Sequence, residues 1–524
     1  MTATDPALPR TRPADGSQGA DARRADAETA DTEPAEAKAT VTLVLVAAAG
    51  LMVSLSLSLL VPVLPRLAVE LHTSATSTEW LLTATLLTGA ISVPVLGRLG
   101  DLYGKKRMLV VSLATFLAGS LICAFTSNIG VLIAGRAVAG LSVAAIPLGI
   151  SLVGTVLPDR RAGSGIALIS AMLGVGSALG LPLAGVIAEH ADYHVLFWIC
   201  VGGGAATLAG TVALVPEPPV SGHGRFDLPG ALLLAVALAA LLLPLSQAGV
   251  WGWASVKTTG LLAAAAVLLV VFVLVERRLA SPLVDMVVNA RPALLLTNIA
   301  SVAVGFALFA VLIGTANFVE APQAAGYGFG SSILVGGFCL LPSGLFMLVL
   351  SPVSARISAL FGPKVALALG AAVVAAGFLG RILLVAHLWE IVAGTAITGA
   401  GTGIAYAAMP SLVLRSAPRD ELAAANGLNS LARTAGSSLA SALGATVLAS
   451  QTITLAGYAY PSLAAYRTLF AICAAAALAG AAIALVIPVA SAPEADAGAA
   501  SAGSTGTNEA YQAPSCAAHP PAVS

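Results

Sequence analysis

Charge is scarce in this sequence, since only 10% of its 524 residues are Asp, Glu, Lys or Arg, whereas 58% are hydrophobic. A soluble protein of this length needs more charged side chains to cover its surface, so the composition excludes an ordinary soluble enzyme. A bilayer accepts apolar exteriors, and we therefore expect a polytopic membrane protein. The formal net charge is zero, so the overall charge gives no reason to expect a nucleic-acid partner.

Residues that carry enzymatic chemistry are also rare. The five cysteines have no disulfide-framework spacing, and no Cys-x-x-Cys motif or Cys/His cluster offers a metal site. The Gly104-Lys105-Lys106 run has Lys106 where a phosphate-binding loop needs Ser or Thr. No nucleophile–base pair is visible. The sequence therefore predicts neither an enzyme nor a resident cofactor.

Long apolar runs are abundant, and their length of roughly 20 residues is what a helix needs to cross the hydrocarbon. The sequence predicts an all-α membrane protein of fourteen spans. We place them at residues 41–61, 79–98, 108–125, 130–157, 163–187, 195–215, 228–247, 258–276, 294–316, 332–352, 365–385, 389–411, 425–449 and 467–489.

The two ends of the chain have a different composition. Residues 1–38 are rich in Ala, Asp, Glu, Arg and Pro, and residues 491–524 in Ala, Gly, Ser and Pro. Neither has an apolar period, so both are predicted to be disordered tails.

Lys and Arg are unevenly shared between the loops. With the amino terminus inside, fourteen cations fall on the cytoplasmic side and three (Arg66, Lys257 and Arg467) on the other. This asymmetry predicts a multi-pass protein of the cell membrane with both termini in the cytoplasm. High Ala and Gly content, with Arg over Lys, favours a bacterial origin.

The most specific motif follows the second span. It consists of Gly97, Arg98, Gly100, Asp101, Gly104, Lys105, Lys106 and Arg107. Glycines let helix ends approach closely, and Asp101 has two possible roles, pairing with a cation or capping a helix start. The motif resembles the loop between the second and third helices of major facilitator superfamily transporters. The resemblance implies a conformational latch at these residues.

The chain also repeats itself. Residues 94–106 align without gaps with residues 352–364, at an offset of 258 that corresponds to eight spans. Transporters of this superfamily are built from such parallel repeats. An eight-span offset in fourteen implies a 6+2+6 arrangement, with bundles at 39–216 and 291–490 and two inserted helices within 217–290. This arrangement resembles the fourteen-helix drug:proton antiporter branch.

Two further motifs match that branch. Arg136 and Gly140 resemble the Arg-x-x-Gln-Gly motif, although Ala139 replaces the Gln. Gly176, Gly180, Pro182 and Gly185 resemble the glycine–proline motif of the exporters. Small residues four apart let helices pack closely in lipid, so Gly176 and Gly180, with Gly436, Ala440 and Gly444, are predicted to form the seam between the halves. Ordinary packing without a gating role is the alternative.

Charges inside the spans are few. Arg136 and Arg433 are expected either to line a cavity or to serve packing, and Arg381 is expected to snorkel to the outer surface. The branch carries an Asp in its first helix where this chain has Ser56. Glu320 is the best candidate for a proton site, with a solvated helix end as the alternative. Asn317, Gln323 and Tyr327 are expected to surround it.

The candidate substrate contacts are Asn317, Tyr406, Met409, Asn426 and Asn429, beside Arg433 and Glu320. Together with the resemblance, these residues predict a monomeric transporter that works in the lipid bilayer. It would expel a small lipophilic or cationic compound, such as an antibiotic or another drug, in exchange for protons. A proton-independent facilitator or importer of a small polar solute is the alternative on the same fold.

Overall fold

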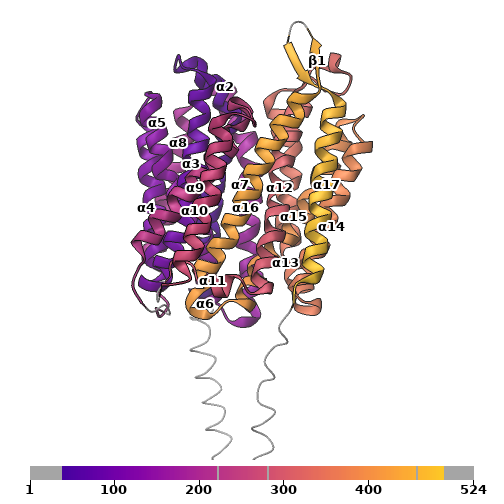
Figure 1. The fold of residues 1–524 in the computed structure, drawn as a ribbon. Coiled ribbons are helices and arrows are strands. Elements are labelled where there is room, and N and C mark those ends of the chain that lie inside the picture. Colours follow the sequence, from indigo (N-terminus) through magenta and orange to yellow (C-terminus); the bar gives the residue numbers. More distant parts are fainter. Residues whose placement is uncertain (1–37, 221–223, 280–281, 456–457, 489–524) are drawn as a thin grey trace, which may run out of the picture. The chain divides into compact units, whose positions relative to one another are not determined.

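The computed structural model describes residues 38–220, 224–279, 282–455 and 458–488. The predicted tails 1–38 and 491–524 lie outside these residues, except for Lys38, which begins the first helix. Helices dominate the described part of the chain (Figure 1).

The long helices are Lys38–Val63, α3 (Ala75–Tyr103), α4 (Lys105–Ala124), α5 (Ile129–Gly140) continued by η2 (Leu141–Ala144) and α6 (Ala145–Val156), α7 (Asp159–His190), α8 (His194–Leu214), α9 (Leu228–Trp251), α10 (Val256–Glu276), α12 (Pro292–Glu320), α13 (Ile333–Phe361), α14 (Pro363–Leu383), α15 (Leu388–Ser416), α16 (Leu422–Ser450) and α17 (Leu463–Val486). The short elements are η1 (Val61–Val63), α2 (Leu64–Glu70), α11 (Met286–Asn289), η3 (Gln323–Ala325), η4 (Arg419–Glu421) and the antiparallel strands β1 (Thr452–Leu455) and β2 (Tyr458–Pro461).

Each of the fourteen predicted spans corresponds to one long helix, counting α5, η2 and α6 as one. Thirteen of the long helices in the described residues are apolar enough to cross a membrane by composition. α16 has the length but carries Asn426, Asn429 and Arg433 on a buried face. The fold is therefore all-helical, with thirteen to fourteen helices of membrane length.

The predicted loop at 97–107 is wrong in one respect, since almost all of it is helical. α3 continues to Tyr103 and α4 begins at Lys105, so Gly104 alone separates them. Gly104 has φ +115°, and Gly362, its counterpart in the repeat, has φ +86° between α13 and α14. Residues with side chains rarely adopt this backbone region, which explains a glycine at both junctions.

The repeat is also visible in the packing of the helices. α3 packs against α16, and α7 packs against α13. In the order of the long helices, α13 comes eight places after α3 and α16 eight places after α7, so the two contacts are equivalent in the repeat. We call these two contacts the seam. α9 lies against α3, α10 and α16, so the inserted hairpin touches both repeats.

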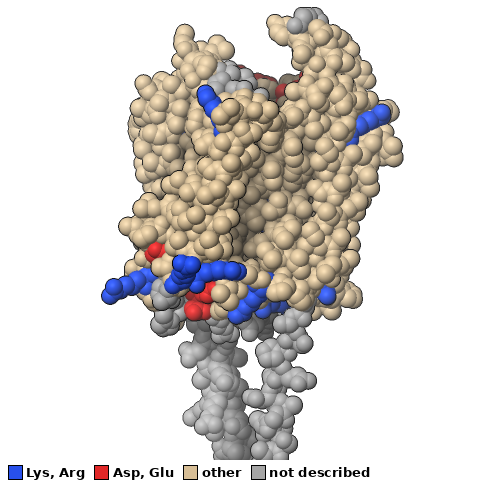
Figure 2. Space-filling model, in the orientation of Figure 1, with Lys and Arg blue, Asp and Glu red and all other residues tan. Residues whose placement is uncertain are grey.

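The two ends of the bundle differ in charge. Figure 2 shows Lys and Arg gathered around one end, which we call the basic end. Its exposed cations include Arg107, Arg277, Arg278, Arg291, Arg356 and Arg415. The strands β1 and β2 lie at the opposite end, which we call the hairpin end (Figure 1).

Candidate functional site

Asp101 closes the seam at the basic end. Its side chain is fully buried, and its two carboxylate oxygens accept hydrogen bonds from the backbone N–H groups of Ala423 (3.3 Å) and Ala424 (3.0 Å), in the first turn of α16. A carboxylate at a helix N-terminus satisfies unpaired amides and interacts favourably with the helix dipole. Capping is therefore the role that the geometry gives Asp101. The charges of Lys105 and Arg98 also act on this carboxylate.

Backbones touch directly beside this cap. A Cβ atom on Gly97 would lie 2.9 Å from the carbonyl oxygen of Ala423, and one on Gly427 would lie 3.0 Å from that of Val93. Only glycine permits this distance between α3 and α16. Gly100 instead faces Leu148 of α6, and Gly104 faces Glu217, so the three glycines of the motif serve three different contacts.

The cations of the motif have a separate partner. The backbone N–H of Lys106 donates to Glu217 Oε1 (3.2 Å), and Arg107 Nε lies 3.8 Å from Glu217 Oε2. Lys106 Nζ donates to the carbonyl of Val212 (3.1 Å). The basic run thus ties α4 to the end of α8 and to the segment after it, whereas Asp101 serves the seam. Glu217 was missed by the sequence analysis, because nothing in its local pattern distinguishes it.

Arg136 reaches the first helix. Its guanidinium donates to Ser56 Oγ (2.8 Å) and to the carbonyl of Ser56 (3.3 Å), and only 2% of the residue is exposed. Ser56 is the position where the antiporter branch carries Asp, so the arginine meets a neutral acceptor here. Gly140 lies one turn further on, against Thr85 and Thr88 of α3.

Arg433 is the centre of a polar network in the second repeat. It donates to Asn429 Oδ1 (3.0 Å) and Ser430 Oγ (2.8 Å), and its guanidinium carbon lies 5.1 Å from the centre of the Tyr406 ring. Asn429 in turn donates to Asn298 and Ser301 of α12. The predicted residues Tyr406, Asn429 and Arg433 thus come together between α12, α15 and α16.

Two other predicted residues are close to this network in the chain. Asn426 is buried one turn earlier on α16, and its Oδ1 atom has no hydrogen-bond partner among the described residues. Met409 is fully buried on α15.

Glu320 and Asn317 lie elsewhere, at the hairpin end of α12. Asn317 is exposed, and Glu320 is partly buried against Gly336 of α13. Their expected neighbours direct their polar atoms away, since Gln323 donates to the carbonyl of Phe329 and Tyr327 to that of Pro461. Tyr327 and Glu320 both act on Tyr466, so the expectation that these groups surround Glu320 stays a prediction.

Arg381 does not snorkel. It is 0% exposed, its guanidinium carbon lies 4.3 Å from the centre of the Phe470 ring, and its side-chain nitrogens have no hydrogen-bond partner among the described residues. The side chain turns toward Gly394 of α15, where no Cβ blocks it. The cation–π contact replaces the route to the surface.

The predicted seam residues on α7 need correction. Cβ atoms on Gly176 and Gly180 would collide with Ser54 and Ser58 of the first helix, within the same repeat. The face of α7 that meets α13 carries Gly174, Ala178, Pro182 and Gly185 instead.

The same correction applies in the second repeat. Gly436 packs on Val302 of α12, and Gly444 faces Leu469 of α17. Small residues occupy more than one face of α7 and α16, so their spacing alone does not identify the neighbour.

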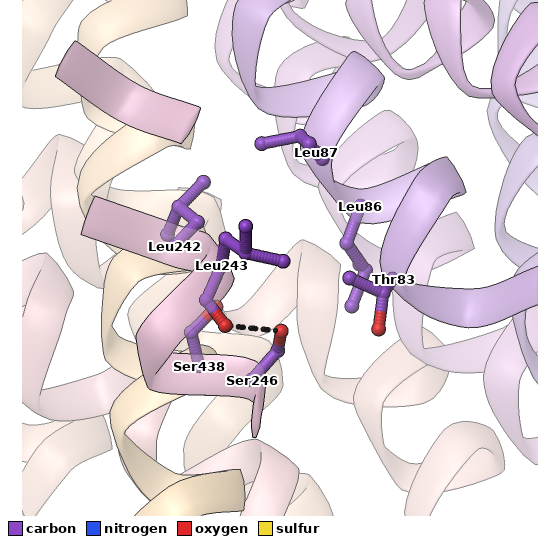
Figure 3. A pocket seen from close by; sticks show the side chains of 7 residues that line it. All are labelled: Thr83, Leu86, Leu87, Leu242, Leu243, Ser246 and Ser438. Atoms are coloured by element: carbon purple, nitrogen blue, oxygen red, sulfur yellow. Dashed lines mark hydrogen bonds between the residues drawn. The ribbon is translucent and has the colours of Figure 1, made fainter. Parts of the chain in front are cut away.

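A narrow cavity marks where the seam meets the inserted hairpin. Figure 3 shows Thr83, Leu86 and Leu87 of α3 opposite Leu242, Leu243 and Ser246 of α9, with Ser438 of α16. Its volume is about 10 Å³, which holds about one water molecule. The three helices are therefore nearly closed against one another at this level.

Comparisons with known proteins agree with this fold. The family model of the Major Facilitator Superfamily matches residues 46–343 and 302–511. The solved structure of the human organic anion transporter MFSD10 (TETRAN) is similar with a TM-score of 0.61, at 15% identity, over 85% of this chain and 99% of that one. At this identity the structure supports the fold alone.

Similar curated proteins are drug-efflux proteins by name. The tetracenomycin C resistance and export protein of Streptomyces glaucescens is 27% identical over 78% of this chain and 76% of its own length. The multidrug resistance protein Stp of Mycobacterium tuberculosis is 26% identical over 71% and 68%. Multidrug resistance protein 3 of Bacillus subtilis is 27% identical over 70% and 72%. Because the family model covers most of the chain, this protein belongs to the Major Facilitator Superfamily, and it is a membrane transporter related to drug-efflux proteins.

Proposed function

We propose that this protein exports a small lipophilic or cationic compound in exchange for protons, by alternating access across the bacterial cell membrane. The observation that carries the proposal is the duplicated seam, α3 with α16 and α7 with α13, closed at the basic end by the Asp101 cap. The seam combines close backbone contacts at glycines, the Asp101 cap and apolar side chains such as Val93 and Met347, and in this proposal it opens and closes at these contacts. The names of the related exporters favour outward transport of a drug-like compound.

In this proposal the basic end faces the cytoplasm, as do both termini, because cations are retained on that side during insertion. The two repeats, 39–216 and 291–490, rock about the seam, and the hairpin within 217–290 bridges them. The Asp101 cap forms when the basic end closes and breaks when it opens.

The substrate would be held between the repeats, near Arg433, Tyr406 and Asn429. The Tyr406 ring and the buried Met409 offer polarizable surface, and the Arg433 network offers hydrogen bonds. The partly buried Glu320 remains a candidate proton carrier at the hairpin end. Monomeric function is part of the same proposal.

The direct test is transport in proteoliposomes with an imposed pH gradient. We expect efflux of a lipophilic cation such as ethidium to rise at least tenfold when the gradient favours proton entry, and to collapse when an ionophore removes the gradient. Transport that is indifferent to the gradient would instead favour a facilitator, which the neutral Ser56 acceptor of Arg136 makes the second candidate.

Replacing Asp101 with Ala tests the cap. The change leaves the N–H groups of Ala423 and Ala424 without their acceptor, and we expect a loss of about 1–2 kcal/mol from the closed basic end. That loss corresponds to a shift of about 5–30-fold in the closed–open equilibrium. Reactivity of a cysteine at Val93, which is buried against Ala423 in the same contact, toward a water-soluble maleimide should rise in the Ala variant, and unchanged reactivity would contradict the role of the cap.

Glu421 predicts a pH dependence of the same contact. It precedes α16, and burial, with further contributions from Asp285 and Asp420, raises the pKa of its carboxyl from 4.5 to about 7. The raised pKa means that the closed contact favours the neutral form. The contribution of Glu421 to the stability of the closed basic end, relative to the open one, is therefore largest below about pH 4.5. It declines between about pH 4.5 and pH 7 and stays constant at higher pH.

The measurement is the distance between spin labels on Tyr103 of α3 and Leu360 of α13, recorded across this pH range. In Glu421→Gln, which is neutral at every pH, the decline should be absent. A decline of the same size in the Gln variant would assign it to another group.

A further inference from the structure

Two carboxyl groups meet at the basic end of the inserted hairpin. Asp227 caps α9, where its Oδ1 accepts from the N–H of Gly230 (3.0 Å). Glu276 is the last residue of α10, and its Oε2 accepts from the N–H of Val284 (3.2 Å). Each carboxyl thus has one oxygen anchored to the backbone.

The other two oxygens, Asp227 Oδ2 and Glu276 Oε1, face each other. A Cβ atom on Gly230 would collide with both, so they lie side by side over the same glycine. The residues are 8% and 2% exposed, and neither oxygen has a hydrogen-bond donor among the described residues. Two buried carboxylates side by side repel each other when both are ionised. A single proton shared between them replaces this repulsion with a hydrogen bond.

Asp227 is the charged group that acts on Glu276. The charged side chains of the elements packed around the pair at this end are those of Arg98 and Asp101 on α3, Glu421 before α16, Arg433 on α16, Asp285 before α11, and Arg225, Arg277 and Arg278 in the adjoining segments. Asp101 is committed to the cap of α16, and Asp285 caps α11. The pair is therefore a local two-carboxyl site.

The hairpin that carries the pair bridges the seam. Gln247 of α9 donates to Thr83 of α3 (3.5 Å), and Trp253, which follows α9, donates to Thr446 of α16. The narrow cavity of Figure 3 lies between these same three helices. A change in the spacing of α9 and α10 at the pair is thus transmitted to the helices that open and close.

We propose that Asp227 and Glu276 form a proton-binding site, which holds one shared proton while the basic end is closed and releases it when the end opens. This inference rests on the proposed proton-coupled transport and supplies the membrane carboxyl that the first helix lacks. On release the two carboxylates repel each other and separate the ends of α9 and α10. On proton uptake the hydrogen bond draws them together.

Infrared spectroscopy of the full-length protein in lipid tests the site directly. We expect a carbonyl-stretch band of a protonated carboxyl that disappears as the pH is raised. The part of the band that belongs to the pair should be lost in Asp227→Asn and in Glu276→Gln. Glu421→Gln, which changes a nearby acid outside the pair, should remove only the contribution of Glu421 and retain that part. An unchanged band in Asp227→Asn and Glu276→Gln would overturn the proposal.

Gradient-driven efflux in proteoliposomes gives the second readout. Glu276→Gln keeps a hydrogen bond to Asp227 but exchanges no proton there, so we expect gradient-driven efflux to fall at least tenfold relative to the wild type. Efflux equal to wild type in a correctly inserted Gln variant would overturn the inference while leaving proton coupling intact. A wild type that ignores the gradient would instead reject the proposed function, and the infrared band would still decide whether the pair binds a proton.

Discussion

Gly97→Leu should abolish export by holding the basic end open. The Cβ atom alone would lie 2.9 Å from the carbonyl oxygen of Ala423 and 3.4 Å from the Cα of Ala424, and both atoms belong to backbone that cannot rotate away. Overpacking by one or two methylene groups costs about 1–3 kcal/mol, and a leucine adds four carbons at this point. A cost of about 3 kcal/mol shifts the closed–open equilibrium by about 150-fold, so the variant should lie mostly on the open side.

The matched control for this variant is Gly163→Leu on α7. It lies at the same end of the bundle, but a Cβ atom there would meet nothing within 4 Å. We expect near-normal efflux from the control and less than a tenth of it from Gly97→Leu, with equal amounts of both proteins in the membrane. The smaller change Gly97→Ala should give an intermediate rate. Normal efflux from Gly97→Leu would mean that α3 and α16 do not separate and close during transport.

Gly337→Leu should have the opposite effect, because it separates the seam at the hairpin end. A Cβ atom on Gly337 of α13 would lie 2.7 Å from the backbone nitrogen of Pro182 and 2.9 Å from its Cα. Proline has no N–H, so α7 presents a bare nitrogen to which α13 approaches closely. A leucine at this position prevents α13 from approaching α7 closely, so the hairpin end cannot close.

Export should again fall below a tenth of the wild-type rate, although the protein is trapped in the other state. The control is Gly380→Leu on α14, also near the hairpin end, where a Cβ atom would meet nothing within 4 Å. Substrate should still bind to Gly337→Leu from the outside in right-side-out vesicles. Loss of that binding together with transport would indicate misfolding, and a rate like that of the control would contradict closure at α7 and α13.

The number and order of the helices were predictable because each span is a continuous apolar run, which can be recognised without knowing its neighbours in the fold. The helix ends were not predictable, because α3 carries Arg98 and Asp101 inside its last turns, where their partners compensate for the cost of burying their charge. The repeat at offset 258 aligns Gly104 with Gly362, and the structure adds that both glycines have a positive φ at a junction between two helices.

Partners across the fold were the harder part. Asp101 meets amides more than 300 positions away in the chain, and only the structure identifies α16 as the helix that it caps. Gly180 was assigned to the wrong neighbour, because α7 has small residues on two faces. Arg381 was expected at the surface because its aromatic partner, Phe470, lies on a helix far along the chain. The contact of Arg136 with Ser56 was not foreseen either.

The central claim is that the two ends of the seam open in alternation. It is tested by double electron–electron resonance on two label pairs, Tyr103 with Leu360 at the basic end and Glu79 with Ser450 at the hairpin end, in the wild type, Gly97→Leu and Gly337→Leu. The account predicts a longer first distance and a shorter second distance in Gly97→Leu, and the reverse in Gly337→Leu. Distances that lengthen or shorten together at both ends would contradict it.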